Sequence, residues 1–349
     1  MAKYRFHTLD VFTSTRFGGN PLAVVLDADD LPGERMQAIA AEFNLSETVF
    51  VMKPARPGAN RKRVRIFTPM TELPFAGHPT VGTAFLLARL GLVALDAANP
   101  ELVLEESVGD VPVKVSMKDG AAVATQMSVP RMPERGPQAA SRAELAAALS
   151  LAEVDVLDGA APYSCGLPFL FVPLRGLDAI RRAKLRPDLW EKLAPGGSVR
   201  GVFPFTTETE SADAQVHGRM FAPALGVRED PATGSAVSAL AGWLHDASPR
   251  DGNRRWRVEQ GFEIGRPSLI ELEADVAGGK VTAVRVGGRL GDGCRGRDRG
   301  LNSFEAFERL VRKPSLSIPA SGPYIHPIDG TAMVAVPTGE GHERPQEKQ

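Results

Sequence analysis

The residues whose side chains could take part in proton transfer lie at or near the starts of apolar segments. His78 lies in the first turn of one predicted helix, Asp230 and Ser235 flank the start of another, and Glu47 precedes an apolar run. The first turn of a helix has unpaired N–H groups at the positive end of the helix dipole, so it can bind an anion such as a carboxylate. Carboxylates and an imidazole beside such an end suit proton transfer on an anionic ligand.

Each of these residues also has a structural explanation. Glu47 could be a surface carboxylate at a strand end, and His78 could form hydrogen bonds at a helix N-terminus without a catalytic role. Asp230 followed by Pro231 suits a helix cap with proline in the first turn, and Ser235 could be an early-turn polar residue. The inference of a site depends on their convergence in one cleft.

Two similar segments could position these residues. Residues 75–90 begin with small residues and then become apolar on nearly every side, which predicts a helix enclosed by protein. Residues 233–244 repeat this pattern, and Gly77 can be aligned with Thr233. An internal duplication would explain the likeness. The alternative is that two Ala/Gly-rich helices are alike by chance.

The rest of the chain predicts short strands joined by Gly, Asp and Pro turns, with an amphipathic helix over 33–44 and a capped helix over 141–151. We expect an α+β fold of two similar domains. Each would be a curved, mostly antiparallel, barrel-like sheet wrapped around a central helix, with the active cleft between the two helix N-termini. The predicted domains are 1–129 and 139–289, joined by a polar linker over 130–138.

Composition narrows the class of protein. The 41 basic and 42 acidic residues nearly balance, without a basic stripe for nucleic acid, and no apolar run is long enough to span a membrane. The start of the sequence lacks the apolar core of a signal peptide. The two cysteines, Cys165 and Cys294, are far apart, which fits a reducing cytoplasm without a disulfide framework.

Three motifs and a turn carry a resemblance to a known family. The motifs are Asn44–Phe50, Phe67–Thr80 and Glu229–Ala236, and the turn is Gly18-Gly19-Asn20-Pro21. In order and spacing they resemble the PhzF-like isomerases of phenazine biosynthesis, which have the diaminopimelate epimerase-like fold. The resemblance covers about residues 5 to 289. It is specific for the family and much less so for the substrate.

The resemblance implies cofactor-free proton transfer on a small carboxylate metabolite by a homodimer, and the cysteine usage indicates a cytoplasmic location. Glu47 would remove a proton from one carbon and return it to another, which requires a dry cleft that brings its pKa toward neutrality. Asp230 could hold a substrate amino or hydroxyl group, or raise the proton affinity of Glu47 by repulsion. His78 could donate to an oxygen where negative charge develops, and Ser235 with the amides of Gly77 and Gly234 could bind a carboxylate.

Related amino-acid epimerases use two facing cysteines as bases. The aligned positions here are Gly77 and Thr233, neither of which is a thiol, so two-thiol epimerisation is disfavoured. The first hypothesis is therefore an isomerase that uses Glu47. An epimerase of an amino-acid derivative and a non-catalytic binder of a small anionic metabolite are the alternatives.

Other candidate residues are assigned structural roles. Glu72 is a rival base near the same helix, but its counterpart in the family is not the catalytic acid. His7, His217 and His245 lack metal-ligand spacing, so we predict no metal. Cys165 is expected to be a small buried residue because it has no histidine partner nearby in sequence.

The segment 290–349 departs from the family pattern. The family ends with one more strand, whereas this segment has no convincing apolar period, and we expect it to be disordered. A codon choice exists for Leu290 to Gly300 that, read one base later, encodes a peptide resembling the usual last strand. We hypothesise a frameshift, which resequencing would test. The sequence as written would leave an unpaired sheet edge.

Overall fold

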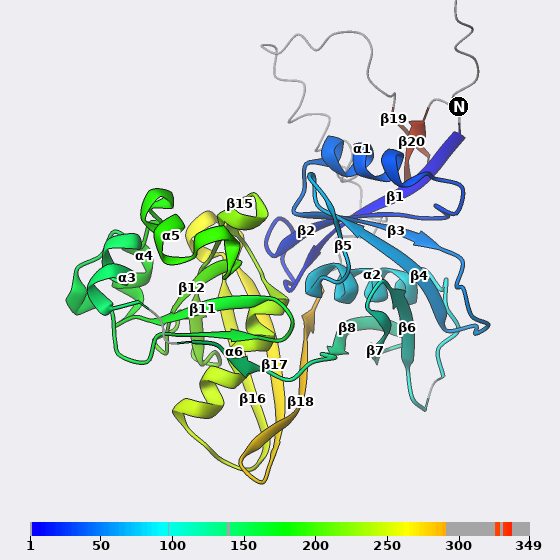
Figure 1. Ribbon diagram of the computed structural model, residues 1–349. Helices are drawn as coiled ribbons and strands as arrows, with labels where there is room; N and C mark the ends of the chain where they lie inside the picture. The colour runs from blue at the N-terminus through cyan, green and yellow to red at the C-terminus, as the bar shows by residue number, and fades with distance from the viewer. Residues whose placement is uncertain (1, 97, 138–139, 291–324, 329–330, 337–349) are drawn as a thin grey trace, which may run out of the picture.

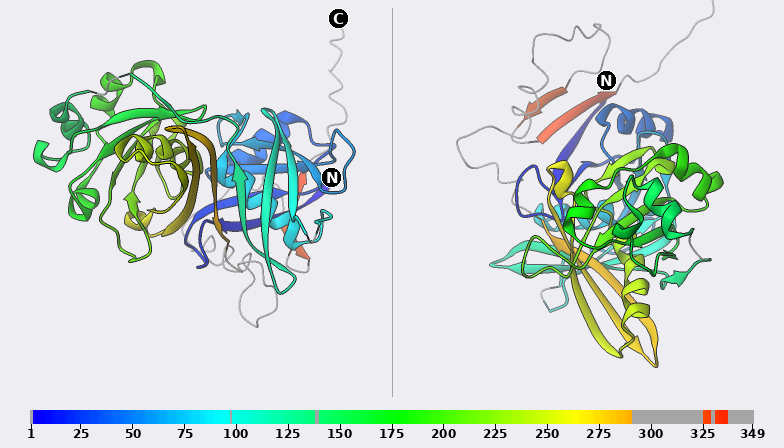
Figure 2. Two further views of the ribbon diagram at one scale, coloured as in Figure 1. Left: turned by 90° about the horizontal axis from the view of Figure 1, so that it is seen from below. Right: turned by 90° about the vertical axis from the view of Figure 1, so that its left-hand side faces the viewer.

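The computed structural model describes residues 2–96, 98–137, 140–290, 325–328 and 331–336, with the backbone alone for residues 2, 3, 325–328 and 331–336. Its strands form one continuous sheet that bends into two curled halves (Figure 1). Each half encloses one long helix, α2 (Gly77–Arg89) in the first and α6 (Gly234–Ala247) in the second, as the turned views in Figure 2 also show. The expected α+β fold of two curved sheets around central helices is confirmed.

In the first half, neighbouring strands are antiparallel except for the parallel pairs β2–β3 and β4–β6. The helix α1 (Gly33–Phe43) connects the first parallel pair, and α2 lies in the connection of the second. The strands are β1 (Ala2–Val11), β2 (Asn20–Val25), β3 (Glu47–Met52), β4 (Arg61–Phe67), β5 (Glu72–Leu73), β6 (Glu101–Glu106), β7 (Gly109–Lys118) and β8 (Ala121–Ser128).

The second half has parallel pairs at β11–β12 and β13–β16. The short helices α4 (Leu177–Arg182) and α5 (Pro187–Leu193) connect the first of these pairs, and α6 lies in the connection of the second. The strands are β9 (Glu134–Arg135), β10 (Ala161–Ser164), β11 (Pro168–Pro173), β12 (Gly201–Thr206), β13 (Val216–Gly218), β14 (Met220–Ala222), β15 (Val227–Asp230), β16 (Gly252–Gln260), β17 (Ser268–Ala277) and β18 (Lys280–Arg289).

The two halves share one topology. In each, an antiparallel pair leads through a helical connection to a parallel strand, then through the enclosed helix to a second parallel strand, and ends in an antiparallel meander. This shared order supports the internal duplication. The last strands of the two meanders, β8 and β18, pair with each other and join the halves.

The enclosed helices are held by apolar packing on all sides. Every residue of α2 from Gly77 to Leu87 is buried, and α6 is buried except at a few positions. Apolar residues of both halves belong to one continuous core, so the starts of α2 and α6 are held at the junction of the halves. Burial of apolar area is the main stabilising contribution at such a junction.

Two local predictions have different outcomes. The helix α3 (Arg142–Ala148) begins with the predicted capping box, in which Ser141 and Glu144 exchange side-chain and backbone hydrogen bonds. The predicted linker 130–138 is more ordered than expected, because Glu134 and Arg135 form β9 against β10. A two-residue strand carries too little pattern to be read from sequence.

The expectation of disorder over 290–349 needs correction at two segments. Strands β19 (Ile325–Ile328) and β20 (Thr331–Val336) form a hairpin, and β20 pairs antiparallel with Ala2 to Phe6 of β1. The outer edge of β1 is therefore covered along these residues. Residues 291–324, 329–330 and 337–349 lie outside the described part of the chain. Among the described helices, none has the length and hydropathy that a membrane crossing would need.

Candidate active site

The N-termini of α2 and α6 meet at the junction of the two halves. A Cβ atom placed on Gly77 would lie 3.2 Å from the Cα atom of Gly234 and 3.2 Å from the backbone nitrogen of Ser235. Most side chains do not tolerate so close an approach, so the contact favours glycine at 77. The structure thus brings together Gly77, Gly234 and Ser235, as predicted.

The register of the two helix starts differs by one residue from the predicted alignment. The helices begin at Gly77 and Gly234, with Ala76 and Thr233 at the cap positions, so Thr233 corresponds to Ala76 rather than to Gly77. None of these four residues is a cysteine or a carboxylate. A two-thiol site therefore stays disfavoured in either register.

These two helix starts lack the negative groups found at the others. Neither helix has a side-chain cap or an acidic residue in its first turn. Every other described α-helix has an acidic residue there, namely Glu34, Glu144, Asp178 or Asp188. An acidic residue near a helix start satisfies the positive end of the helix dipole. At α2 and α6 no acidic residue of the helix itself does so.

Glu47 and His78 face each other beside this junction. Glu47 is the first residue of β3 and His78 the second residue of α2, and their Oε2 and Nε2 atoms are 3.4 Å apart. Both atoms are buried, and neither has a hydrogen-bond partner. Burial lowers the pKa of His78 to about 3, so its imidazole is neutral at neutral pH and the contact is not an ion pair.

Asp230, the last residue of β15, adds a second carboxylate beside Glu47. Burial raises the pKa of Glu47 well above its ordinary value, and the negative charge of Asp230 raises it further. Burial also raises the pKa of Asp230, to about 6, although hydrogen bonds from Thr233, Asn20 and Ser46 oppose this rise. Within the described residues, no Arg or Lys side chain forms an ion pair with either carboxylate.

Three residues that the sequence did not single out for the site surround Asp230. Asn20 and Thr233 donate side-chain hydrogen bonds to its two carboxylate oxygens, and Gln260 bonds to its backbone and to Thr233. In the sequence, Asn20 was recognised only as part of the turn at residues 18–21, and Thr233 only as the residue at the position of an epimerase cysteine. Gln260, the last residue of β16, has no sequence signal that would connect it to Asp230.

The other titratable candidates lie in separate contacts. Glu72 forms a two-pronged ion pair with Arg65, with distances of 2.7 and 2.6 Å, which holds its pKa below the ordinary value and fits the structural role expected for it. Cys165 is half-buried, and burial together with the charge of Glu134 raises its pKa to about 12, so it is not a thiolate at neutral pH.

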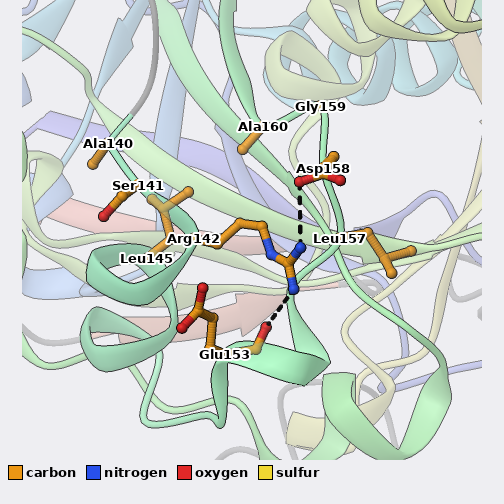
Figure 3. A pocket seen from close by; sticks show the side chains of 9 residues that line it. All are labelled: Ala140, Ser141, Arg142, Leu145, Glu153, Leu157, Asp158, Gly159 and Ala160. Carbon is orange, nitrogen blue, oxygen red and sulfur yellow. Dashed lines mark hydrogen bonds and ion pairs between the residues drawn. The ribbon is translucent and has the colours of Figure 1, made fainter.

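A surface pocket also lies beside α3, drawn in Figure 3. Its polar centre is Arg142, which donates to Asp158 and to the backbone oxygen of Glu153. None of the predicted site residues lines this pocket. It is therefore separate from the junction of α2 and α6.

Comparison with known proteins identifies the family of the part of the chain that forms the two halves. The family model described as "Phenazine biosynthesis-like protein" matches residues 9–290. An uncharacterized isomerase of Mesorhizobium japonicum is 44% identical over 286 residues, covering 80% of this chain and 93% of that protein. The trans-2,3-dihydro-3-hydroxyanthranilate isomerase of Pseudomonas aeruginosa is 39% identical over 302 residues, covering 84% and 99%.

Solved structures agree with this placement. The crystal structure of a PhzF-family phenazine biosynthesis protein from Bacillus anthracis superposes with a TM-score of 0.75 at 28% identity, covering 83% of this chain and 97% of that one. The family match spans both halves of the sheet and both enclosed helices. The chain therefore belongs to the PhzF family of phenazine biosynthesis-like isomerases.

Proposed function

We propose that this isomerase moves a proton between two carbons of a small carboxylate-containing metabolite, with Glu47 as the acid and base and without a cofactor. The observation that carries the proposal is the pair of buried, unpartnered atoms Oε2 of Glu47 and Nε2 of His78, 3.4 Å apart. Buried polar atoms normally have partners. A substrate bound beside both atoms would supply those partners.

The reaction can be written with side chains alone. Glu47 takes a proton from one carbon as that C–H bond breaks, the electron pair shifts a double bond, and Glu47 returns the proton to a second carbon. The substrate is neither oxidised nor reduced. A carboxylate with a raised pKa suits both steps, because its proton affinity lies nearer to that of the reacting carbon.

Other residues would bind the substrate and stabilise charge. The uncapped starts of α2 and α6, with the amides of Gly77 and Gly234 and the hydroxyl of Ser235, would bind its carboxylate. Neutral His78 would donate to an oxygen where negative charge develops. Asp230 would raise the proton affinity of Glu47.

The test is solvent-deuterium incorporation, followed by mass spectrometry over a panel of small carboxylates. The panel begins with trans-2,3-dihydro-3-hydroxyanthranilate, because a relative is named for it. Glu47→Gln should lower incorporation by about a hundredfold or more, the usual contribution of a general acid or base. Glu72→Gln is the matched control, because that carboxylate is paired with Arg65, and it should keep most of the activity.

Retained incorporation in Glu47→Gln would overturn the assignment of the base. Binding without incorporation in the wild type, with affinity unaffected by Glu47→Gln, would instead identify a non-catalytic binder. Product chirality separates an isomerase from an epimerase. The homodimer and the cytoplasmic location stay predictions, which light scattering and cell fractionation can test.

A further inference from the structure

The hydrogen bonds around Asp230 have fixed directions. Thr233 donates its backbone N–H to Oε1 of Gln260 at 3.0 Å, and Nε2 of Gln260 donates to the backbone oxygen of Asp230 at 2.7 Å. A backbone N–H can only donate and a carbonyl can only accept, so the amide of Gln260 has one permitted orientation.

That orientation determines where the hydroxyl hydrogen of Thr233 points. Nε2 of Gln260 also donates to Oγ1 of Thr233, at 3.0 Å. The hydroxyl group has a single hydrogen, which is left for Oδ2 of Asp230 at 2.5 Å. The Thr233 hydroxyl therefore donates to Oδ2 of Asp230. Its direction is set through Gln260 by two backbone groups, the N–H of Thr233 and the carbonyl of Asp230.

Asn20 acts in the same way on the other oxygen. Its Nδ2 atom donates to the backbone oxygen of Ala232 at 2.9 Å, which fixes the orientation of its amide, and donates to Oδ1 of Asp230 at 2.8 Å. Asn20 and Gln260 are both completely buried, so water does not compete for these bonds. Each oxygen of Asp230 thus accepts a hydrogen bond whose donor is fixed. Asn20 cannot flip its amide at Oδ1, and Gln260 cannot flip its amide to reorient the Thr233 hydroxyl at Oδ2.

Asn20, Thr233 and Ser46 donate hydrogen bonds to Asp230, which favour its ionised form, whereas Oε2 of Glu47 has no hydrogen-bond partner. We propose that Asn20, Thr233 and Gln260 are positioning residues that keep Asp230 ionised, so that the proton shared by the two carboxylates resides on Glu47. This inference deepens the proposed function and rests on it for the roles of Glu47 and Asp230. The hydroxyl of Thr233 then orients Asp230 and does not exchange protons with substrate.

The consequence is a stronger base. An ionised Asp230 repels the ionised form of Glu47 and so favours the state in which Glu47 holds a proton. No cation of the described chain pairs with either carboxylate to cancel this repulsion. The arrangement is asymmetric, because one carboxylate has bonds to both oxygens and the other presents a free oxygen to the site.

Isotope-edited infrared spectroscopy of the protein without substrate tests where the proton lies. We expect a protonated-carboxyl band at neutral pH that shifts when glutamate carries a ¹³C side-chain carboxyl and is lost in Glu47→Gln. Subtracting the Glu47→Gln spectrum removes other protonated glutamates. A band that instead shifts with ¹³C-labelled aspartate, and that is lost in Asp230→Asn, would overturn the proposal.

A pair of variants tests the positioning role. Thr233→Val keeps the shape of the side chain and removes its hydroxyl, and Thr233→Ser restores the hydroxyl. On acidification, the midpoint for protonation of labelled Asp230 should rise by about one pH unit or more in Thr233→Val and stay at the wild-type value in Thr233→Ser. Equal midpoints in all three proteins would overturn the role of Thr233.

These spectra are independent of turnover. A protein that gives the expected bands but incorporates no deuterium would refute the proposed reaction and leave the proton assignment standing. A protein that incorporates deuterium while its proton resides on Asp230 would refute the proton assignment and leave the proposed reaction standing. If Thr233→Val does not fold, the wild-type labelling experiment still decides between the two carboxylates.

Discussion

At the scale of single residues, the carboxyl groups of this isomerase differ mainly in what surrounds them. Glu72 has an arginine partner and a lowered pKa, whereas Glu47, which is partly buried, and Glu106, which is buried, pair with no cation of the described residues and have raised pKa values. The residue type is the same in all three. Burial and neighbouring charge decide the proton affinity of each of them.

Glu106 is a buried carboxyl with a hydroxyl neighbour. Oγ1 of Thr80 lies 2.7 Å from the backbone oxygen of Ala76 and 2.6 Å from Oε1 of Glu106. The Thr80 hydroxyl is the donor to Glu106, and this hydrogen bond opposes the rise in the pKa of Glu106 that burial causes. Burial raises the pKa of Glu106 to about 8, which agrees with a neutral carboxyl at this position.

We predict that Glu106→Gln flattens the dependence of stability on pH. The folded-state pKa lies above the unfolded value, so the favourable contribution of Glu106 is complete below about pH 4.5 and is lost as pH rises through about 8. Relative to wild type, the variant should gain on the order of 3 kcal/mol between pH 5 and pH 8. Urea unfolding at both pH values measures this gain. Glu42→Gln, at an exposed position, is the control and should change with pH as wild type does.

At the scale of elements, the contact between the starts of α2 and α6 depends on glycine. We predict that Gly77→Ala lowers activity by tenfold or more (~1.4 kcal/mol) with little loss of stability, because the added Cβ would push apart helix ends that are 3.2 Å from it. Activity and melting temperature measured together test this. The prediction is wrong if activity is retained.

Gly82→Ala in the same helix is a matched contrast. Its Cβ would lie 2.7 Å from side-chain atoms of Leu22 and Val11 in the core, so overpacking should cost about 1–3 kcal/mol of unfolding free energy. The folded fraction should keep its activity, because Gly82 does not touch the other helix start. Loss of activity without loss of stability in this variant would contradict the contrast.

A cluster of buried charged side chains stabilises the pairing of β13 with β16. His217 has a fully buried side chain, with Nδ1 at 2.8 Å from Glu259 and Nε2 at 2.9 Å from Glu263. The two carboxylates raise the pKa of His217 to about 9 against the effect of burial. The imidazole is therefore a cation between two carboxylates.

We predict that His217→Ala destabilises the protein at neutral pH by about 3–5 kcal/mol, because two buried carboxylates lose their cation. The raised pKa means that the contribution of His217 is complete below about pH 6.5 and is lost as pH rises through about 9. The difference between variant and wild type should therefore shrink at pH 10. Denaturant unfolding at pH 7 and pH 10 measures it. A difference of the same size at both pH values would contradict this assignment.

At the scale of the whole molecule, the two halves share one sheet, one core and one site. Pairing of β8 with β18 makes the sheet continuous, and Asn20 of the first half bonds to Asp230 of the second. Arg266 of the second half also bonds to Asp10 and to backbone oxygens of the turn at Gly18 and Gly19. The relative position of the halves is thus set by polar contacts as well as by packing.

We predict that the hairpin of β19 and β20 protects the edge of β1. A chain ending after Leu290 would expose the backbone groups of Ala2 to Phe6, whereas a chain ending after Val336 would keep the pairing. The shorter chain should melt several degrees lower and associate more, and the longer one should match the full chain. Melting curves with light scattering test this. An unchanged melting temperature in the shorter chain would mean that the pairing contributes little.

The sequence by itself determined the local elements, the family and most of the polar residues at the site. Strand alternation, the Ser141 capping box and the two small-residue helix starts are written in short windows of sequence, and they appear in the structure near the predicted bounds. The motif around Glu47, His78 and Asp230 needed no coordinates. Short pieces such as β9 and the hairpin of β19 and β20 were missed, because pairing partners far away in sequence stabilise them.

Only the tertiary structure decided how those residues act together. Asn20 meets Asp230 across 210 positions of sequence, and Gln260 reaches Thr233 from another strand, so no local pattern could have connected them. The lowered pKa of His78 likewise arises from burial, and the raised pKa of Glu47 arises from burial and from the charge of Asp230. Sequence supplies the titratable groups, and folding sets their protonation, because proton affinity depends on the solvent and charges that surround a group in space.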